Sequence, residues 1–164
     1  MWSSDRRKFL VLAGALALGA CGFTPAYGPQ GGGTALLGGV EADAPKTRDE
    51  FALVRRLSER LGPAGAARYR LAYKLNTETI GQAITPDNAT TRYSLTGSAE
   101  YRLHDRASDA VLLTGRVSSF TSWSATGSIV STQAAEIDAH ERLMRMLADQ
   151  IVTRLLAQAG SLPQ

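Results

Sequence analysis

The side chains that could support nucleophilic, proton-transfer or metal chemistry are few in this sequence. It contains one cysteine, Cys21, and two histidines, His104 and His140. Zinc sites and catalytic triads need several such groups held together. His140 falls on the apolar stripe of an expected helix, where a core or boundary histidine is the simplest interpretation, and His104 falls in an expected turn. The sequence therefore predicts no catalytic residue, no metal site and no cofactor.

Two other patterns have simple structural explanations. Asp105 and Asp109 flank the expected turn, and turns select Asp for local hydrogen bonds without any catalysis. The glycine run 31–33 follows no strand, and no Gly-Lys-Ser/Thr triplet occurs, so no phosphate-binding loop is predicted.

Cys21 has the most specific surroundings. Residues 1–20 form an export-signal pattern, with a basic stretch, a 12-residue apolar run from Phe9 to Ala20 that is too short to span a membrane, and small residues before the cysteine. Leu18-Gly19-Ala20-Cys21 resembles the bacterial lipobox, in which the thiol is acylated and becomes the first residue after cleavage. Two or more acyl chains anchor a protein stably. Ser4 to Leu10 also resembles a twin-arginine signal, so both export routes stay open.

Basic residues recur on one side of the expected strands. Strict alternation places them opposite Tyr69, Leu71 and Tyr73. Guanidinium forks bind phosphate in a bidentate manner, so such a face could bind an anionic lipid headgroup. The simpler alternative is a solvated sheet face. The candidate binding residues are Arg70, Lys74, Arg92, Arg102 and Arg116.

Nucleic acid is a poor candidate for this face. The formal charge of +3 falls by two when Arg6, Arg7, Lys8 and Asp5 leave with the signal, and the exported chain enters the wrong compartment.

The elements that position these residues follow from their periodicity. A Gly/Pro-rich tether over 21–33 precedes a possible short strand over 34–40. Thr47-Arg48-Asp49-Glu50 fits a capping box, and the helix that follows has apolar residues at 3.6-residue spacing until Gly62-Pro63. Alternating strands are expected near 68–76, 92–103 and 110–121, the second and third joined by a turn over 104–109.

The C-terminal part is expected to be a hydroxyl-rich link, 118–132, followed by a long helix with its polar face at Asp138, Arg142, Arg145 and Asp149. This order predicts one α+β domain over 34–160. It would be a two-layer sandwich with a mostly antiparallel sheet of three to four strands and two helices on one face.

Two blocks resemble a known family: 21–28, Cys-Gly-Phe-Thr-Pro-Ala-Tyr-Gly, and the helical stretch 135–156. Both are similar to the alphaproteobacterial branch of the LPS-assembly lipoproteins, the small subunit of the outer-membrane lipopolysaccharide translocon. The resemblance implies a non-enzymatic protein that is lipid-anchored to the outer membrane. It would plug a large β-barrel partner, assist assembly of that barrel and contact lipopolysaccharide.

Two other functions remain open at this stage. The same architecture would suit an auxiliary lipoprotein of an ABC-type lipid transport system. A periplasmic hydrolase is suggested only by His140 and the hydroxyl-rich link.

Overall fold

A computed structural model describes residues 28, 33–65, 67–84 and 89–163. The expected signal and lipid site, residues 1–21, lie outside the described residues, as does most of the tether. The elements in chain order are α2 (Gly33–Leu36), β1 (Val40–Ala42), α3 (Arg48–Leu61), β2 (Tyr69–Ile84), β3 (Thr90–Asp105), β4 (Val111–Ser124), α4 (Ile129–Gln158) and the 3-10 turn η1 (Ala159–Ser161).

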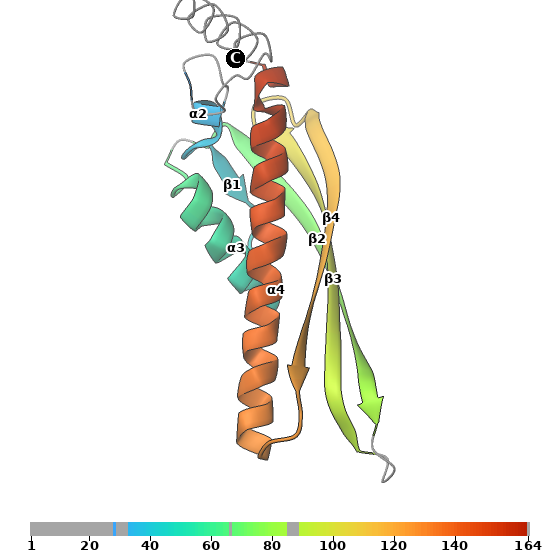
Figure 1. Ribbon diagram of the computed structural model, residues 1–164. Coiled ribbons are helices and arrows are strands. Elements are labelled where there is room, and N and C mark those ends of the chain that lie inside the picture. Colours follow the sequence, from blue (N-terminus) through green and yellow to red (C-terminus); the bar gives the residue numbers. More distant parts are fainter. Residues whose placement is uncertain (1–27, 29–32, 66, 85–88, 164) are drawn as a thin grey trace, which may run out of the picture.

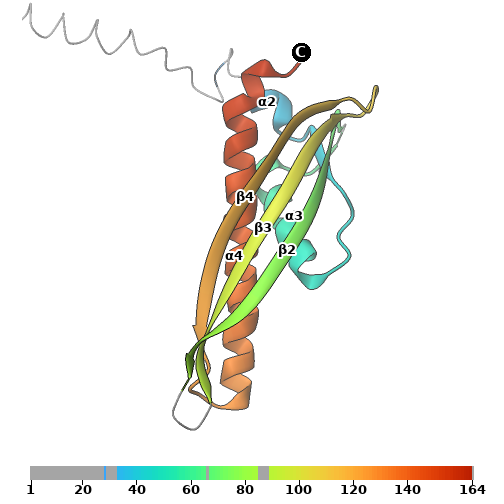
Figure 2. The same ribbon diagram turned by 90° about the vertical axis from the view of Figure 1, so that its right-hand side faces the viewer.

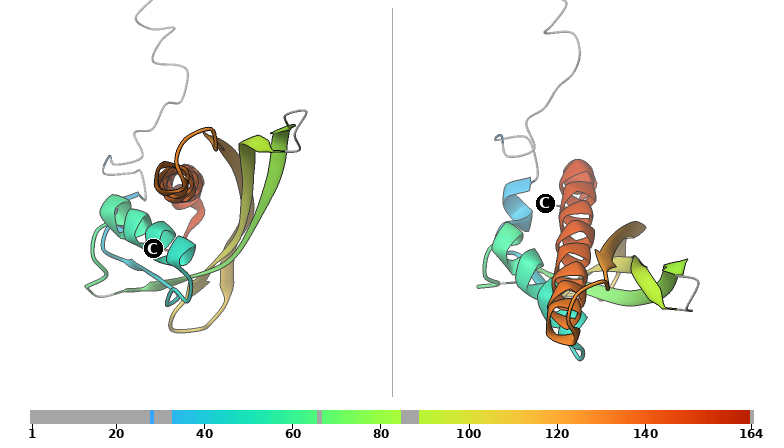
Figure 3. Two further views of the ribbon diagram at one scale, coloured as in Figure 1. Left: turned by 90° about the horizontal axis from the view of Figure 1, so that it is seen from below. Right: turned by 60° about the horizontal axis from the view of Figure 1, so that its bottom comes forward.

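The sheet has four strands in the order β1-β2-β3-β4, with β1 parallel to β2 and the other pairs antiparallel. Helices α3 and α4 lie on one of its faces, and the strands curve around α4 (Figures 1 and 3). The predicted α+β class with a mostly antiparallel sheet is therefore confirmed. The structure adds the short helix α2 to the two helices that were expected.

Helix α3 begins where the capping box predicts. The Oγ1 of Thr47 accepts from the Glu50 backbone N–H at 3.2 Å, and the Glu50 carboxylate accepts from the N–H of Lys46 at 2.6 Å. The helix ends at Gly62, whose φ of 82° favours glycine.

Helix α4 is the long spine of the core. Its 30 residues give a length of about 45 Å. Its buried side chains meet the inward face of the strands, where apolar residues alternate as expected. The largest buried α4 residues are Leu143, Met144, Leu147, Ile151 and Leu155.

The expected strand over 34–40 is wrong. Residues 33–36 are helical, and β1 starts only at Val40. Gly38 has a φ of 67°, and its N–H donates to the Leu61 carbonyl at 2.6 Å, so the chain turns back at the end of α3 before it reaches the sheet. Leu36 is fully buried beneath this turn.

The expected link over 118–132 is also wrong. Strand β4 continues to Ser124, and α4 begins at Ile129 with Ser128 as its cap. Val117, Thr121 and Trp123 alternate inward and are buried, while Ser118, Ser122 and the exposed Phe120 are on the other face. The Thr121 hydroxyl donates to the Ala139 carbonyl of α4 at 3.1 Å, so this segment is part of the core.

Candidate anionic-group binding face

All five predicted basic residues lie on the sheet face turned away from the helices. The register brings three of them together, because Glu100 of β3 stands opposite Lys74 of β2 on one side and Arg116 of β4 on the other. Arg102 lies two residues along β3, on the same face. Lys74, Arg102 and Arg116 are called the basic cluster below.

The charge of this cluster is only partly neutralised. Arg116 Nη1 is 3.9 Å from Glu100 Oε1, and its Nη2 donates to the Ser98 hydroxyl at 3.3 Å. Within the described ranges no carboxylate forms an ion pair with Lys74 or Arg102. Three cations around one carboxylate leave an excess positive charge, which favours an anionic ligand.

The cluster borders a small hollow in the sheet surface. The hollow has a volume of about 150 Å³ and is lined by Ala72, Tyr73, Lys74, Glu100 and Arg102. This is the space of about five waters, enough for a small anionic group and too small for an acyl chain.

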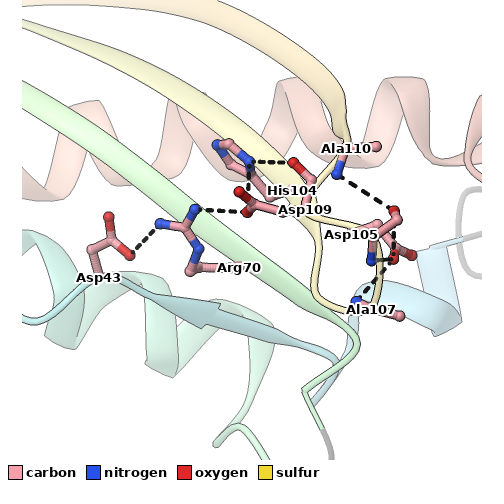
Figure 4. Close-up of polar contacts among 8 residues, drawn as sticks. Asp43, Arg70, His104, Asp105, Ala107, Asp109 and Ala110 are labelled. Carbon is pink, nitrogen blue, oxygen red and sulfur yellow. Dashed lines mark hydrogen bonds and ion pairs between the residues drawn. The ribbon is translucent and has the colours of Figure 1, made fainter.

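Arg70 lies at the upper end of the same face but is already paired. Its guanidinium donates to Asp109 at 3.1 Å and to Asp43 at 3.3 Å, and these bonds raise the pKa of Arg70 above its usual value (Figure 4). Its main role is therefore to connect the β1 end to the turn between β3 and β4.

That turn is held by Asp105. Its Oδ1 accepts from the backbone N–H and hydroxyl of Ser108 and from the N–H of Ala107, which lowers the pKa of the Asp105 carboxyl (Figure 4). The expected turn over 104–109 is therefore present, but His104 is not a freely solvated turn residue. It is the penultimate residue of β3, its side chain is only 12% exposed, and its Nδ1 lies 3.2 Å from the Asp109 carbonyl.

Arg92 lies apart from the cluster. It is eight residues along β3 from Glu100, which is roughly 27 Å at the strand rise. One headgroup cannot span that distance, so the structure divides the five predicted residues into a cluster of three, a paired Arg70 and a remote Arg92.

Tyr73 lies in β2 between two lining residues of the hollow, but its side chain is on the helix side of the sheet, where it packs against the core. Its hydroxyl is buried without a hydrogen-bond partner among the described residues, and burial together with Glu50 and Asp43 raises the pKa of Tyr73 to about 12. Because the unfolded phenol ionises near pH 10, the folded state loses stability as the pH rises from 10 towards 12.

We therefore expect the Tyr73 phenol to resist ionisation until about pH 12. Absorbance titration at the phenolate band should show this late step in the native protein. The step should be absent from Tyr73→Phe, and a titration curve identical in both proteins would contradict the assignment.

His140 is a structural residue in this fold. Its Nδ1 lies 2.8 Å from Asp49 Oδ2 and 3.0 Å from Oδ1, which ties α4 to the start of α3. Among the described residues, no group of three His, Cys, Asp or Glu side chains could hold a metal ion.

Asp149 makes a second tie between the helices. It accepts from Arg56 at 3.0 and 3.1 Å and from Arg60 at 3.1 Å. Asp149 is on the polar side of α4 as predicted, with a side chain 36% exposed, but its pairing with α3 was not predicted. The contact could not be inferred from α4 alone, because its partners lie 89 and 93 residues away.

The fold and this face define a class: a small α+β domain with one long helix over a curved, mostly antiparallel sheet and a basic outer face. A family model described as lipopolysaccharide-assembly (LptE) matches residues 38–155. The chain belongs to this family of LPS-assembly lipoproteins, as its two sequence blocks suggested.

Solved structures share the fold. A Caulobacter crescentus protein described as a lipoprotein has 25% identity and a TM-score of 0.67, covering 81% of this chain and 99% of its own. The rare lipoprotein B of Shewanella oneidensis has 10% identity and a TM-score of 0.53, covering 73% and 92%. A minor lipoprotein of Acinetobacter baumannii has 17% identity and a TM-score of 0.52, covering 73% and 89%. No curated protein matches the sequence.

No helix among the described residues is both long and apolar enough to cross a membrane.

Proposed function

We propose that this protein is a non-enzymatic outer-membrane lipoprotein that plugs a large β-barrel translocon, assists its assembly and contacts lipopolysaccharide as it passes. Cys21 carries the lipid that holds the domain at the periplasmic side of the membrane. The observation that supports lipopolysaccharide contact is the basic cluster beside a hollow of about 150 Å³.

The outer face also suits a polar barrel lumen. Between Arg92 and the basic cluster, its β3 and β4 residues are Ser and Thr except for the exposed Phe120: Ser94, Thr96, Ser98, Ser118 and Ser122. Such side chains exchange hydrogen bonds with a polar wall, whereas a broad apolar face would favour lipid.

The elongated shape of the domain determines which part of it can reach a partner. Helix α2 and the C-terminal end lie at one end of α4, and the loop from β4 to α4 lies at the other (Figure 1). A lipid on the N-terminal tether would therefore leave that loop about 45 Å away along the helix.

A photoreactive residue at Thr126, exposed in this distal loop, tests the proposal in intact cells. We expect ultraviolet irradiation to crosslink the protein to a large outer-membrane β-barrel. An identical residue at Gly160, exposed at the opposite end, is the position control and should give a different or weaker product.

Capture of an inner-membrane transport subunit at Thr126 would instead support an auxiliary lipoprotein of an ABC-type lipid transporter. Absence of any barrel adduct, with the protein correctly fractionating to the outer membrane, would contradict the plug role.

A further inference from the structure

The two edges of the sheet differ in how their backbone groups are satisfied. Along β4, three side chains of α4 donate to outward carbonyls. Arg154 Nη1 lies 2.7 Å from the Arg116 oxygen, Gln150 Nε2 lies 3.3 Å from that of Ser118, and Arg142 Nη2 lies 3.3 Å from that of Ser122.

These side-chain hydrogen bonds recur at regular spacing because the repeat of the helix matches the repeat of the strand. Four helix residues rise about 6 Å, and two strand residues rise about 6.8 Å, so donors at every fourth helix position can meet carbonyls at every second strand position. Helix α4 therefore covers the β4 edge, one of the ways in which native sheets prevent further strand pairing.

The opposite edge is formed by β1 only for a short distance. Strand β1 pairs with Tyr69 to Leu71, the Tyr69 N–H donates to the Gly39 carbonyl at 2.9 Å, and the Leu71 carbonyl accepts from Asp43 at 3.0 Å. Odd-numbered residues of β2 thus direct their backbone groups towards this edge.

The same direction holds further along β2, because its register with β3 is unbroken up to Gly81. The backbone groups of Leu75, Thr77 and Thr79 therefore face outward beyond the end of β1. No described residue donates to or accepts from them on that side.

The side chains along this stretch are also uncovered. Every residue from Asn76 to Gln82 is exposed, on both faces of the sheet, and this lower part of β2 extends beyond α3 (Figure 2). The stretch contains no proline and no inward-facing charge; its single charged residue, Glu78, is on the outer face, and the register with β3 shifts only beyond Gly81.

We propose that the free edge of β2 from Leu75 to Thr79 accepts an extended strand of the protein's β-barrel partner, continuing the edge where β1 ends. This rests on the proposed function. Strand addition supplies affinity through backbone hydrogen bonds, and β1 already uses this edge in that way.

A second copy of this chain fits the edge poorly. Two antiparallel β2 strands centred on Thr77 would place Ala83 of one copy opposite Leu71 of the other, where β1 is already paired. A short partner strand that ends before Leu71 avoids this conflict.

Thr77→Pro tests the proposal. Proline removes one outward N–H and is tolerated on edge strands, so the variant should keep its circular dichroism and melt within a few degrees of the wild type. We expect its co-purification with the barrel from gently solubilised outer membranes to fall by about tenfold, the effect of losing about 1.4 kcal/mol.

Thr114→Pro is the matched control, because it is an exposed residue of the opposite edge strand β4, where α4 covers the neighbouring Arg116 carbonyl. It should recover the barrel as the wild type does. Equal recovery with Thr77→Pro and the wild type would overturn the edge proposal. Failure of the wild type itself to recover a barrel would instead refute the proposed function.

Amide hydrogen exchange provides a second measurement that needs no variant. The amides of Leu75, Thr77 and Thr79 should exchange rapidly in the free protein and at least about tenfold more slowly in the barrel complex. Unchanged exchange at these three amides in the complex would also overturn the proposal.

Discussion

Leu143→Ala is expected to lower the free energy of unfolding by about 3 to 5 kcal/mol. Leu143 is fully buried in α4, and it packs directly over Gly97 of the central strand β3. Its removal loses apolar burial and leaves a cavity between the two layers, which the helix cannot collapse to fill because the buried residues Ala139 and Leu147 hold it on either side. Urea denaturation followed by circular dichroism measures the loss.

Gly97→Ala is a control for this prediction, because its effect on stability should reverse in the Leu143→Ala background. A Cβ at this position would lie 2.7 Å from Leu143 Cδ2 and 3.3 Å from Leu147 Cδ1. Gly97→Ala alone should therefore destabilise the protein by about 1 to 3 kcal/mol through overpacking. In the Leu143→Ala background the same methyl enters the new cavity and should restore part of the stability. Additive losses in the double variant would show that the two residues do not share this contact.

The elements with strong periodicity were predictable from the sequence. The capping residues of α3, its Gly62 stop, and the alternation in β2 and β3 each depend on neighbours within a few residues. Local rules of this kind need no knowledge of the rest of the chain.

The errors lie where distant contacts decide the structure. Residues 118–124 look like a flexible link because Ser and Thr are frequent, yet burial of Val117, Thr121 and Trp123 against α4 makes them a strand. Residues 34–40 look like a strand, but the bond from Gly38 to the end of α3 turns the chain. Composition could not reveal either contact.

The candidate site was likewise predictable from the sequence only in part. Alternation correctly placed five basic residues on one face, because side chains in a strand have a period of two. Only the register shows that Lys74 and Arg116 flank Glu100, that Arg70 is paired with Asp43 and Asp109, and that Arg92 is remote. Register depends on long-range pairing and so could not be obtained from the strands separately.

Lys74→Ala with Arg102→Ala is expected to weaken binding of purified lipopolysaccharide by about a hundredfold. Each lost charge-assisted hydrogen bond to a phosphate is worth about 1.5 kcal/mol or more, and about 1.4 kcal/mol corresponds to a tenfold change. Neither side chain has an ion-pair partner among the described residues, so their removal should leave the fold intact. Fluorescence titration with the labelled lipid at low and high salt measures the effect, which should shrink as salt screens the cluster.

Arg92→Ala with Arg145→Ala removes the same two charges from positions outside the cluster. Arg92 is far along β3, and Arg145 is exposed on α4. If the cluster forms a defined phosphate site, this control should bind lipopolysaccharide within about twofold of the wild type, because charges farther away than the Debye length of about 8 Å contribute little. Equal losses in both double variants would mean that the protein attracts the lipid only through its overall charge, and the basic cluster would then have no special role.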